Sequence, residues 1–195
     1  MQTQGEEEAG ARNGRLPLPM MTIILCGKPS DAAVSSWLIP VLSSYGGVQY
    51  FCGGRIGGDR EARYLLLDCE QLPDSALESG ILLFKKSFRF YGEKKAIAGL
   101  VPVFSSSHTG AAVFLKGTGL SAITYGMSNK DTISLAGLDD AGASVSIQRT
   151  VRALDGTEIE PGDIRVRLKK PHSAEQVLLL STVLLLCGET PEFRF

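Results

Sequence analysis

The sequence predicts an α/β fold: a mostly parallel sheet with flanking helices and a small antiparallel subsheet. Short apolar runs alternate with helical patterns up to about residue 126, which is typical of strand–helix–strand units in a parallel sheet. Beyond that point, alternating apolar and polar residues replace this rhythm and indicate antiparallel strands. The chain has 195 residues, 44% of them hydrophobic, so it can bury the core of a single domain.

The first predicted strand, residues 22–26, is a short apolar run that ends at Gly27. Ser30 can cap the helix that follows, Pro40 is expected to kink it or to open its last turns, and Gly46 with Gly47 should end it. The next four strands are predicted from the apolar runs VQYFC (48–52), RYLLLDC (63–69), GILLFKKSF (80–88) and LVPVFSSS (100–107). The glycine-rich GGRIGGDR (53–60) is interpreted as a loop.

The second half of the chain begins with a short predicted helix and a sixth strand. An alternating segment then surrounds LDDAGA, which predicts a hairpin, and a further strand places Ile164, Val166 and Leu168 on one face. The last element is a strongly apolar helix ended by Gly188. These elements are, in order, residues 111–116, SAITYG (121–126), DTISLAGLDDAGASVSIQRTV (131–151), EIEPGDIRVRLK (158–169) and residues 174–186.

Charge and cysteine usage exclude several classes of function. The net charge is −1 and the pI is about 6.1, so no global field attracts nucleic acid or an anionic membrane. The four cysteines lack C-x-x-C spacing and only two histidines are present, so we expect buried free thiols and no structural zinc. Two basic clusters are interpreted as solvated charge, with anion binding by the first as the alternative: Lys85, Lys86, Arg89, Lys94, Lys95, and Arg165, Arg167, Lys169, Lys170.

Residues 1–20 are polar, acidic and rich in Gly and Pro, and are expected to be a disordered extension of a single domain that spans residues 21–195. They lack the basic start and apolar core of a signal peptide. The apolar run VLLLSTVLLLC (177–187) is too short to cross a bilayer. We therefore expect a cytoplasmic protein without nucleic-acid or membrane partners.

Gly27 and Lys28 lie between a strand and a helix, which is the arrangement of a phosphate-binding loop. Such a loop needs several consecutive backbone N–H groups around the phosphates, a lysine and a hydroxyl for Mg²⁺. Ser30 offers a hydroxyl, but Pro29 removes one N–H donor and the turn is short. The alternative for Lys28 is an exposed lysine at a strand–helix turn.

Four segments, in the same order, resemble the central ATP-binding domain of the Mur ligases, a family that includes folylpolyglutamate and cyanophycin synthetases. TIILCGK (22–28) lies where those enzymes carry a strand and G-T-N-G-K-T-T, and RYLLLDCEQL (63–72) resembles the strand with the metal-linked acid. VPVFSSSHTGAAVFLKGTGLSAITYGMSNKDTISL (101–135) resembles the N-A-D-D segment that leads to a V-I-T-Y-G strand. PHSAEQVLLLSTVLLLCGETPEF (171–193) is similar to the helix that starts at G-x-H-N-x-x-N.

The resemblance implies a nucleotide held by Gly27, Lys28 and Ser30, with His172 in contact with it and Asp68 in the place of the metal-linked Glu. The departures weaken this site: Ser173 replaces the asparagine, SSSH (105–108) carries no carboxylate, and the loop is shortened. Each lost charge-assisted hydrogen bond is worth about 1.5–3 kcal/mol. For Asp68 the alternative is pairing with a nearby lysine, and for His172 a backbone hydrogen bond at a helix start.

Three functional hypotheses follow. The first is a non-catalytic, Mur ligase central-domain-like protein, a binding or regulatory partner in cell-wall or related ligase metabolism, with no resident cofactor. The alternative is an ATP-dependent ligase or ATPase subunit that binds ATP and Mg²⁺ through a shortened phosphate loop completed by another chain. The third is self-association through the apolar helix at residues 177–186 or an exposed strand edge.

Overall fold

The computed structural model describes residues 20–73, 77–91 and 97–189. The predicted extension lies outside these residues, except for Met20. The described part forms one ten-stranded sheet, a two-stranded sheet and three helices. The strands of the large sheet are β1 (Met21–Cys26), β2 (Val48–Cys52), β3 (Arg55–Gly58), β4 (Tyr64–Cys69), β5 (Gly80–Phe84), β6 (Leu100–Ser105), β7 (Ile123–Gly126), β8 (Ile133–Leu138), β9 (Gly142–Ile147) and β12 (Gly162–Arg167).

The order across the large sheet is β12-β9-β8-β7-β6-β5-β1-β4-β2-β3. The pairs from β2 through β4, β1, β5, β6 and β7 to β8 are parallel, whereas β8–β9, β9–β12 and β2–β3 are antiparallel. β10 (Val151–Arg152) and β11 (Glu158–Ile159) form the small sheet. The predicted fold class, a mostly parallel α/β sheet with an antiparallel subsheet, is confirmed.

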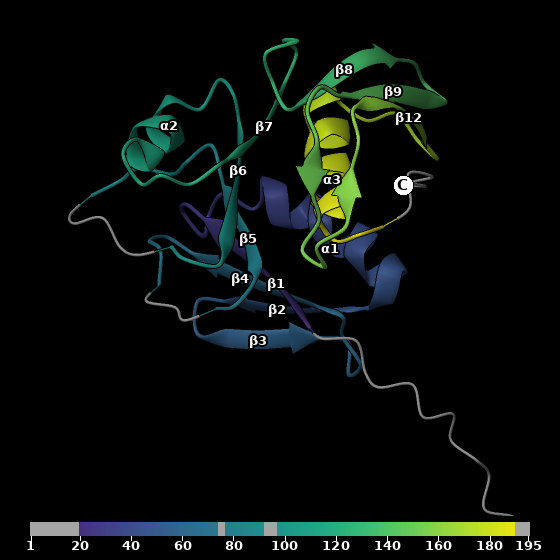
Figure 1. Cartoon of the computed structure of the whole chain (residues 1–195). Coiled ribbons are helices and arrows are strands. Elements are labelled where there is room, and N and C mark those ends of the chain that lie inside the picture. Colours follow the sequence, from purple (N-terminus) through teal and green to yellow (C-terminus); the bar gives the residue numbers. More distant parts are fainter. Residues whose placement is uncertain (1–19, 74–76, 92–96, 190–195) are drawn as a thin grey trace, which may run out of the picture.

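The three helices cover the two faces of the sheet unequally (Figure 1). α1 (Ala33–Gly46) and α3 (Ala174–Leu186) lie together on one face, and α2 (Thr109–Leu115) lies on the other. The first face buries aliphatic side chains of α1, α3 and alternate strand residues. The second face buries an aromatic cluster made by Phe84, Phe88, Phe104 and Phe114. Because both faces are covered, the central strands are apolar at consecutive positions.

α3 is buried on nearly every side, from Val177 to Leu186. It packs against α1 and against β7, β8 and β9, and the chain after β10 also reaches it, since the amide of Leu154 donates to the carbonyl of Leu186 at 2.8 Å. A helix in such a place needs no polar face, which explains the continuous leucine-rich sequence. Within the described residues, no helix has both the length and the apolarity that a bilayer crossing requires.

Two local predictions are wrong. The segment GGRIGGDR contains β3, because Gly53 and Gly54, both at positive φ, turn the chain back so that Ile56 pairs with Phe51. Ser30 does not cap α1: the helix begins two residues after Asp31, and its N-cap is Ala32, which makes no side-chain cap hydrogen bond. α1 continues through Pro40. It ends at Gly46, which agrees with the predicted end at Gly46 and Gly47.

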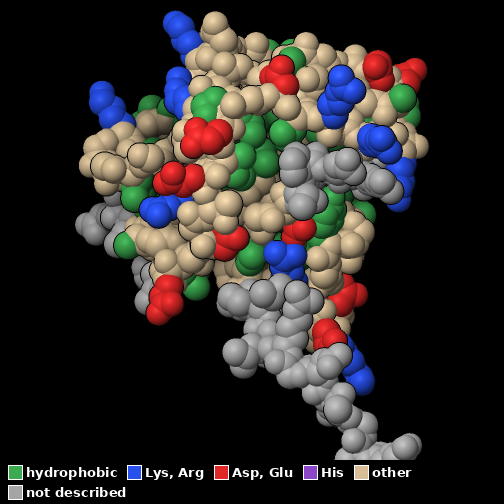
Figure 2. Space-filling model, turned by 45° about the vertical axis from the view of Figure 1, so that its right-hand side comes forward, with side chains coloured by type: hydrophobic (Ala, Val, Ile, Leu, Met, Phe, Trp, Pro, Cys, Tyr) green, Lys and Arg blue, Asp and Glu red, His purple; other side chains and the backbone are tan. Residues whose placement is uncertain are grey.

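Lys and Arg side chains are interspersed with Asp and Glu on the face drawn in Figure 2. No single sign of charge dominates this face, in agreement with the net charge of −1.

Replacing Ser173 by alanine should lower the free energy of unfolding by about 0.5–2 kcal/mol. Ser173 starts α3 with a capping box, in which its Oγ accepts from the amide of Gln176 and the Gln176 side chain accepts from the amide of Ser173. Urea denaturation followed by circular dichroism measures the change. Ser30→Ala is the control and should change stability by less than about 0.5 kcal/mol; an equal loss in both variants would contradict this account of the two helix starts.

Candidate functional site

The turn between β1 and α1, where the sequence predicts a phosphate loop, is bonded to its own chain. The amide of Gly27 donates to the carbonyl of Cys69 at 2.9 Å, and the amide of Lys28 donates to Ser87 Oγ at 3.0 Å. The amide of Asp31 donates to the carbonyl of Lys28 at 2.9 Å, and Pro29 has no N–H. Within residues 27–31, the Ser30 amide alone remains for an external anion.

Gly27 is required by the packing of this turn. Its φ is +145°, and a Cβ at this position would lie 2.8 Å from the Cβ of Lys85. The neighbouring segment also holds the turn from the other side, since the amide of Ser87 donates to Asp31 Oδ2 at 3.2 Å. The turn after β1 and the turn after β5 are therefore one interlocked unit.

Lys85, the first residue after β5, lies at the centre of this unit. Its side chain is 0% exposed, and its Nζ donates to Asp68 Oδ1 at 2.6 Å and to the carbonyl of Lys28 at 3.1 Å. Asp68 is near the carboxyl end of β4, on the other side of β1 from Lys85. The ammonium group thus bridges the ends of three parallel strands.

The other oxygen of Asp68 is also bonded, because the hydroxyl of Tyr50 donates to Oδ2 at 2.8 Å. Burial raises the pKa of Tyr50; Ser35 opposes the shift, and the hydrogen bond to Asp68 adds to it. The phenol therefore stays a protonated donor at neutral pH. Both carboxylate oxygens of Asp68 and the ammonium of Lys85 are satisfied inside the protein.

His108 fixes the backbone of Lys85 from the opposite side. Its Nδ1 accepts from the amide of Ala111 at 3.2 Å at the start of α2, so Nε2 carries the proton and donates to the carbonyl of Lys85 at 2.8 Å. This histidine belongs to the SSSH segment, at the position where the family resemblance leads one to expect carboxylates. Its two contacts make it a support for the Lys85 turn.

A magnesium–nucleotide group does not fit this arrangement. Mg²⁺ is normally held by carboxylates together with phosphate oxygens, but both oxygens of Asp68 already accept hydrogen bonds. In the described parts of the chain, no group of three or more His, Cys, Asp or Glu side chains is placed to hold a metal. The interpretation of Lys85 as solvated charge is wrong. Of the two interpretations of Asp68, the structure shows the pairing with a nearby lysine, which is Lys85.

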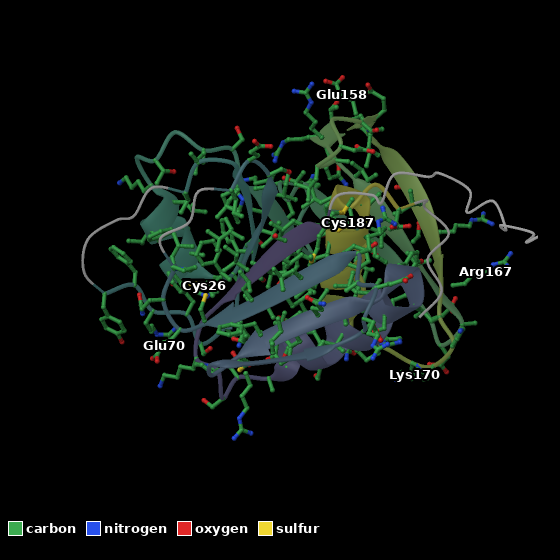
Figure 3. The ribbon with its side chains drawn as sticks, turned by 90° about the horizontal axis from the view of Figure 1, so that it is seen from below. Cys26, Glu70, Glu158, Arg167, Lys170 and Cys187 are labelled. Carbon is green, nitrogen blue, oxygen red and sulfur yellow. The ribbon has the colours of Figure 1, made fainter. Side chains whose placement is uncertain are left out.

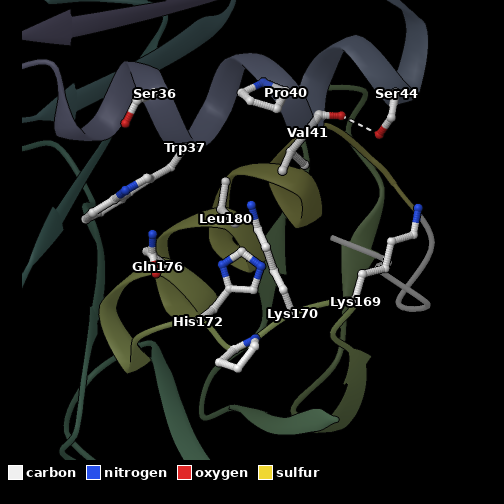
Figure 4. Close-up of a pocket in the computed structure, with 11 residues that line it drawn as sticks. Ser36, Trp37, Pro40, Val41, Ser44, Lys169, Lys170, His172, Gln176 and Leu180 are labelled. Atoms are coloured by element: carbon white, nitrogen blue, oxygen red, sulfur yellow. Dashed lines mark hydrogen bonds between the residues drawn. The ribbon is translucent and has the colours of Figure 1, made fainter. Parts of the chain in front are cut away.

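His172, the remaining predicted contact, lies apart from these residues in a pocket of about 450 Å³ between α1 and the start of α3 (Figure 4). Trp37 and Val41 of α1 and Leu180 of α3 give it apolar walls. Lys169 and Lys170 lie along its rim, from the segment between β12 and α3, and Gln176 faces Trp37. Lys28, Ser30 and Asp68 do not line this pocket, so the structure separates His172 from the predicted phosphate turn.

A second pocket, of about 440 Å³, opens at the carboxyl ends of β5, β6 and β7. Ser105, Ser107 and Thr109 supply hydroxyl groups, and Arg89 and Lys86 supply positive charge. Lys86 forms an ion pair with Glu175 of α3, which also lines this pocket. This second pocket adjoins the Lys85 turn, while the crevice between β1 and β5, the usual ligand position of such a sheet, is filled by Lys85.

The sequence identified Asp68 and the Gly27–Lys28 pair, but not Lys85, Tyr50 or His108. Of these three, only Lys85 had a sequence signal that could have indicated its burial. Side chains alternate between the faces of a strand, so Lys85, two residues after Leu83, shares the buried face of Leu83 toward α1. Tyr50 carried none, because its role depends on the pairing of β2 with β4.

Comparison with solved structures identifies the fold. A scan against protein-family models gives no match, and a search of curated protein sequences gives none either. The chain is similar to a UDP-N-acetylmuramoyl-L-alanyl-D-glutamate–2,6-diaminopimelate ligase, with a TM-score of 0.50 and 13% identity over 90% of this chain and 45% of that one. It is likewise similar to a UDP-N-acetylmuramoylalanyl-D-glutamyl-2,6-diaminopimelate–D-alanyl-D-alanyl ligase from Acinetobacter baumannii, with a TM-score of 0.50 and 10% identity over 88% of this chain and 44% of that one.

The chain spans less than half the length of these ligase structures. At such low identity, the likeness establishes a shared fold and does not extend to activity. The chain therefore has an α/β fold that is distantly related to that of the Mur ligases.

Proposed function

We propose that this chain is a non-catalytic, Mur ligase-like domain that acts as a binding or regulatory partner of a ligase in cell-wall or related metabolism. The observation that carries the proposal is the buried ammonium group of Lys85 between Asp68 and the carbonyl of Lys28. This ammonium group lies at the crevice between β1 and β5, which is the usual ligand position of an open α/β sheet. The link to a ligase is supported by the fold that the chain shares with two Mur ligases.

The magnitudes favour loss of nucleotide binding. Micromolar affinity corresponds to about 8 kcal/mol of binding free energy. Separating a buried ion pair costs about 3–5 kcal/mol, and this separation would have to precede any metal contact by Asp68. The remaining binding free energy of about 3–5 kcal/mol corresponds to a Kd between about 0.2 and 6 mM. Three amides of residues 27–31 already donate within the chain, and this lowers the expected affinity for a nucleotide further.

The second candidate function is a nucleotide-dependent subunit whose phosphate loop is completed by another chain. The observation that favours it is the pocket of about 450 Å³, which combines the face of Trp37 with His172 and two lysines. Lys28 is exposed, so its side chain is free of the Lys85 network. This candidate requires ligand binding by the chain that depends on Lys28 or His172.

The chain should give no heat of micromolar MgATP binding in titration calorimetry and no Mg²⁺-dependent ATP hydrolysis. The reason is the use of the turn amides and of Asp68 by the chain itself. A micromolar Kd that disappears in Lys28→Ala and survives in Arg60→Ala, a control at another exposed cation, would overturn the proposal. A Kd that instead disappears in His172→Ala would establish the second candidate.

Replacing Lys85 by methionine should destabilise the fold by about 3–5 kcal/mol, because Asp68 then keeps a buried, uncompensated charge. Lys86→Met is the matched control: the Lys86 side chain is 72% exposed, so the loss of its ion pair with Glu175 should cost less than about 1 kcal/mol. Urea denaturation measures both. The double variant Lys85→Met with Asp68→Leu should recover most of the loss; if Lys85→Met is no worse than Lys86→Met, the ion pair is not the central support.

The regulatory part of the proposal concerns a full-length Mur-type ligase from the same genome. Saturating amounts of the chain should change the kcat or the KM of that ligase, measured as the rate of phosphate release in the complete reaction. An equal amount of an unrelated protein of similar size serves as the control. Unchanged kinetics for every Mur-type ligase of that genome would contradict a regulatory role in this metabolism.

A further inference from the structure

Cys26 and Cys69 end two neighbouring parallel strands at the same register position. Cys26 of β1 is paired with Cys69 of β4, so the two side chains project to the same face of the sheet. That face carries the aromatic cluster, against which both residues pack. Neighbouring strands lie about 4.8 Å apart, which is within the range of about 4.4–6.8 Å that disulfide-linked Cα atoms adopt.

Each thiol group donates to the backbone beside the other cysteine. The Sγ of Cys69 donates to the carbonyl of Leu25 at 3.6 Å, and the Sγ of Cys26 to the carbonyl of Glu70 at 3.9 Å. Figure 3 shows Cys26 and Glu70 at the same end of the sheet.

The two thiols differ in access to solvent. Cys26 is 0% exposed, whereas Cys69 is only partly buried and is followed by the exposed Glu70. The other two cysteines lie elsewhere: Cys52 is paired with Asp68 and so projects to the opposite face from Cys69, and Cys187 follows α3. A small oxidant from solvent therefore meets Cys69 first, and the thiol beside it is that of Cys26.

We propose that Cys69 and Cys26 form a thiol pair that a peroxide oxidises reversibly to a disulfide. The sulfur of Cys69 attacks one peroxide oxygen; the O–O bond breaks, and Cys69 becomes a sulfenic acid as the other oxygen leaves as water or an alcohol. The sulfur of Cys26 then attacks the sulfenic sulfur, its proton goes to the departing oxygen, and water leaves. Two thiols and one hydrogen peroxide yield one disulfide and two molecules of water.

Geometry makes this disulfide a labile one. Disulfide-linked Cβ atoms are about 3.5–4.5 Å apart, whereas side chains at the same register of neighbouring parallel strands are spaced by about 4.8 Å. The bond would have to draw β1 and β4 together. Strained disulfides of this kind are reduced readily and serve reversible rather than structural roles. The cross-link would lie directly beside Asp68 and the Gly27 turn.

The experiment uses the full chain with Cys52→Ser and Cys187→Ser, which leaves the pair as its only thiols. Hydrogen peroxide should remove both thiols from the folded chain, lower the intact mass by two hydrogen atoms, and give a tryptic cross-link between the Cys26 and Cys69 peptides. A dithiol reductant should restore both thiols. The unsubstituted chain should lose two of its four thiols under the same treatment.

Two further variants assign the roles, after circular dichroism has established that each is folded. Cys26→Ser should stop at a sulfenic acid on Cys69, which dimedone traps, and Cys69→Ser should leave Cys26 unmodified. A chain whose pair reacts only after unfolding in urea would overturn the proposal, and so would over-oxidation of Cys69 without a link to Cys26. These outcomes are independent of nucleotide binding, so they do not bear on the proposed function.

Discussion

The buried ion pair between Lys85 and Asp68 is the interaction on which the top of this sheet depends. One ammonium group joins the ends of β4, β1 and β5, because it donates to the carboxylate of Asp68 and to the carbonyl of Lys28. Tyr50 and His108 complete the unit by bonding the remaining oxygen of Asp68 and the backbone of Lys85. A charge pair at this depth is stable only when all its partners are present, so these residues depend on one another.

This ion pair also lies at the switch point of the sheet. In a parallel α/β sheet, the crevice at the switch point lies between the strands on which the chain changes direction, here β1 and β5. In this chain, the ammonium group of Lys85 lies at this place and donates to Asp68 and to the carbonyl of Lys28, and Ser87 Oγ accepts from the amide of Lys28. These polar groups at the switch point are therefore paired within the chain.

The two faces of the sheet divide the remaining roles. The face with α1 and α3 holds the aliphatic core and the open pocket that contains His172. The other face holds the aromatic cluster and the two thiols of Cys26 and Cys69. The two thiols lie at the strand ends that Lys85 joins, whereas the pocket with His172 lies apart from them.

The sequence by itself determined most of the succession of helices and strands along the chain, the parallel character of the first half, the antiparallel subsheet and the bounds of α3. These features follow from hydrophobic periodicity and glycine positions, which are local signals. It also offered the pairing of Asp68 with a lysine as one alternative. It named no particular lysine: Lys85 and Lys86 are adjacent in FKKSF. Alternation along the strand places Lys85 on the face of Leu83, but only the packing of β4 and β5 on either side of β1 brings Asp68 to it. Likewise, tertiary structure alone decided that β3 pairs with β2, that His172 stands apart from Lys28, and that Cys26 meets Cys69, because these depend on contacts between residues far apart in the chain.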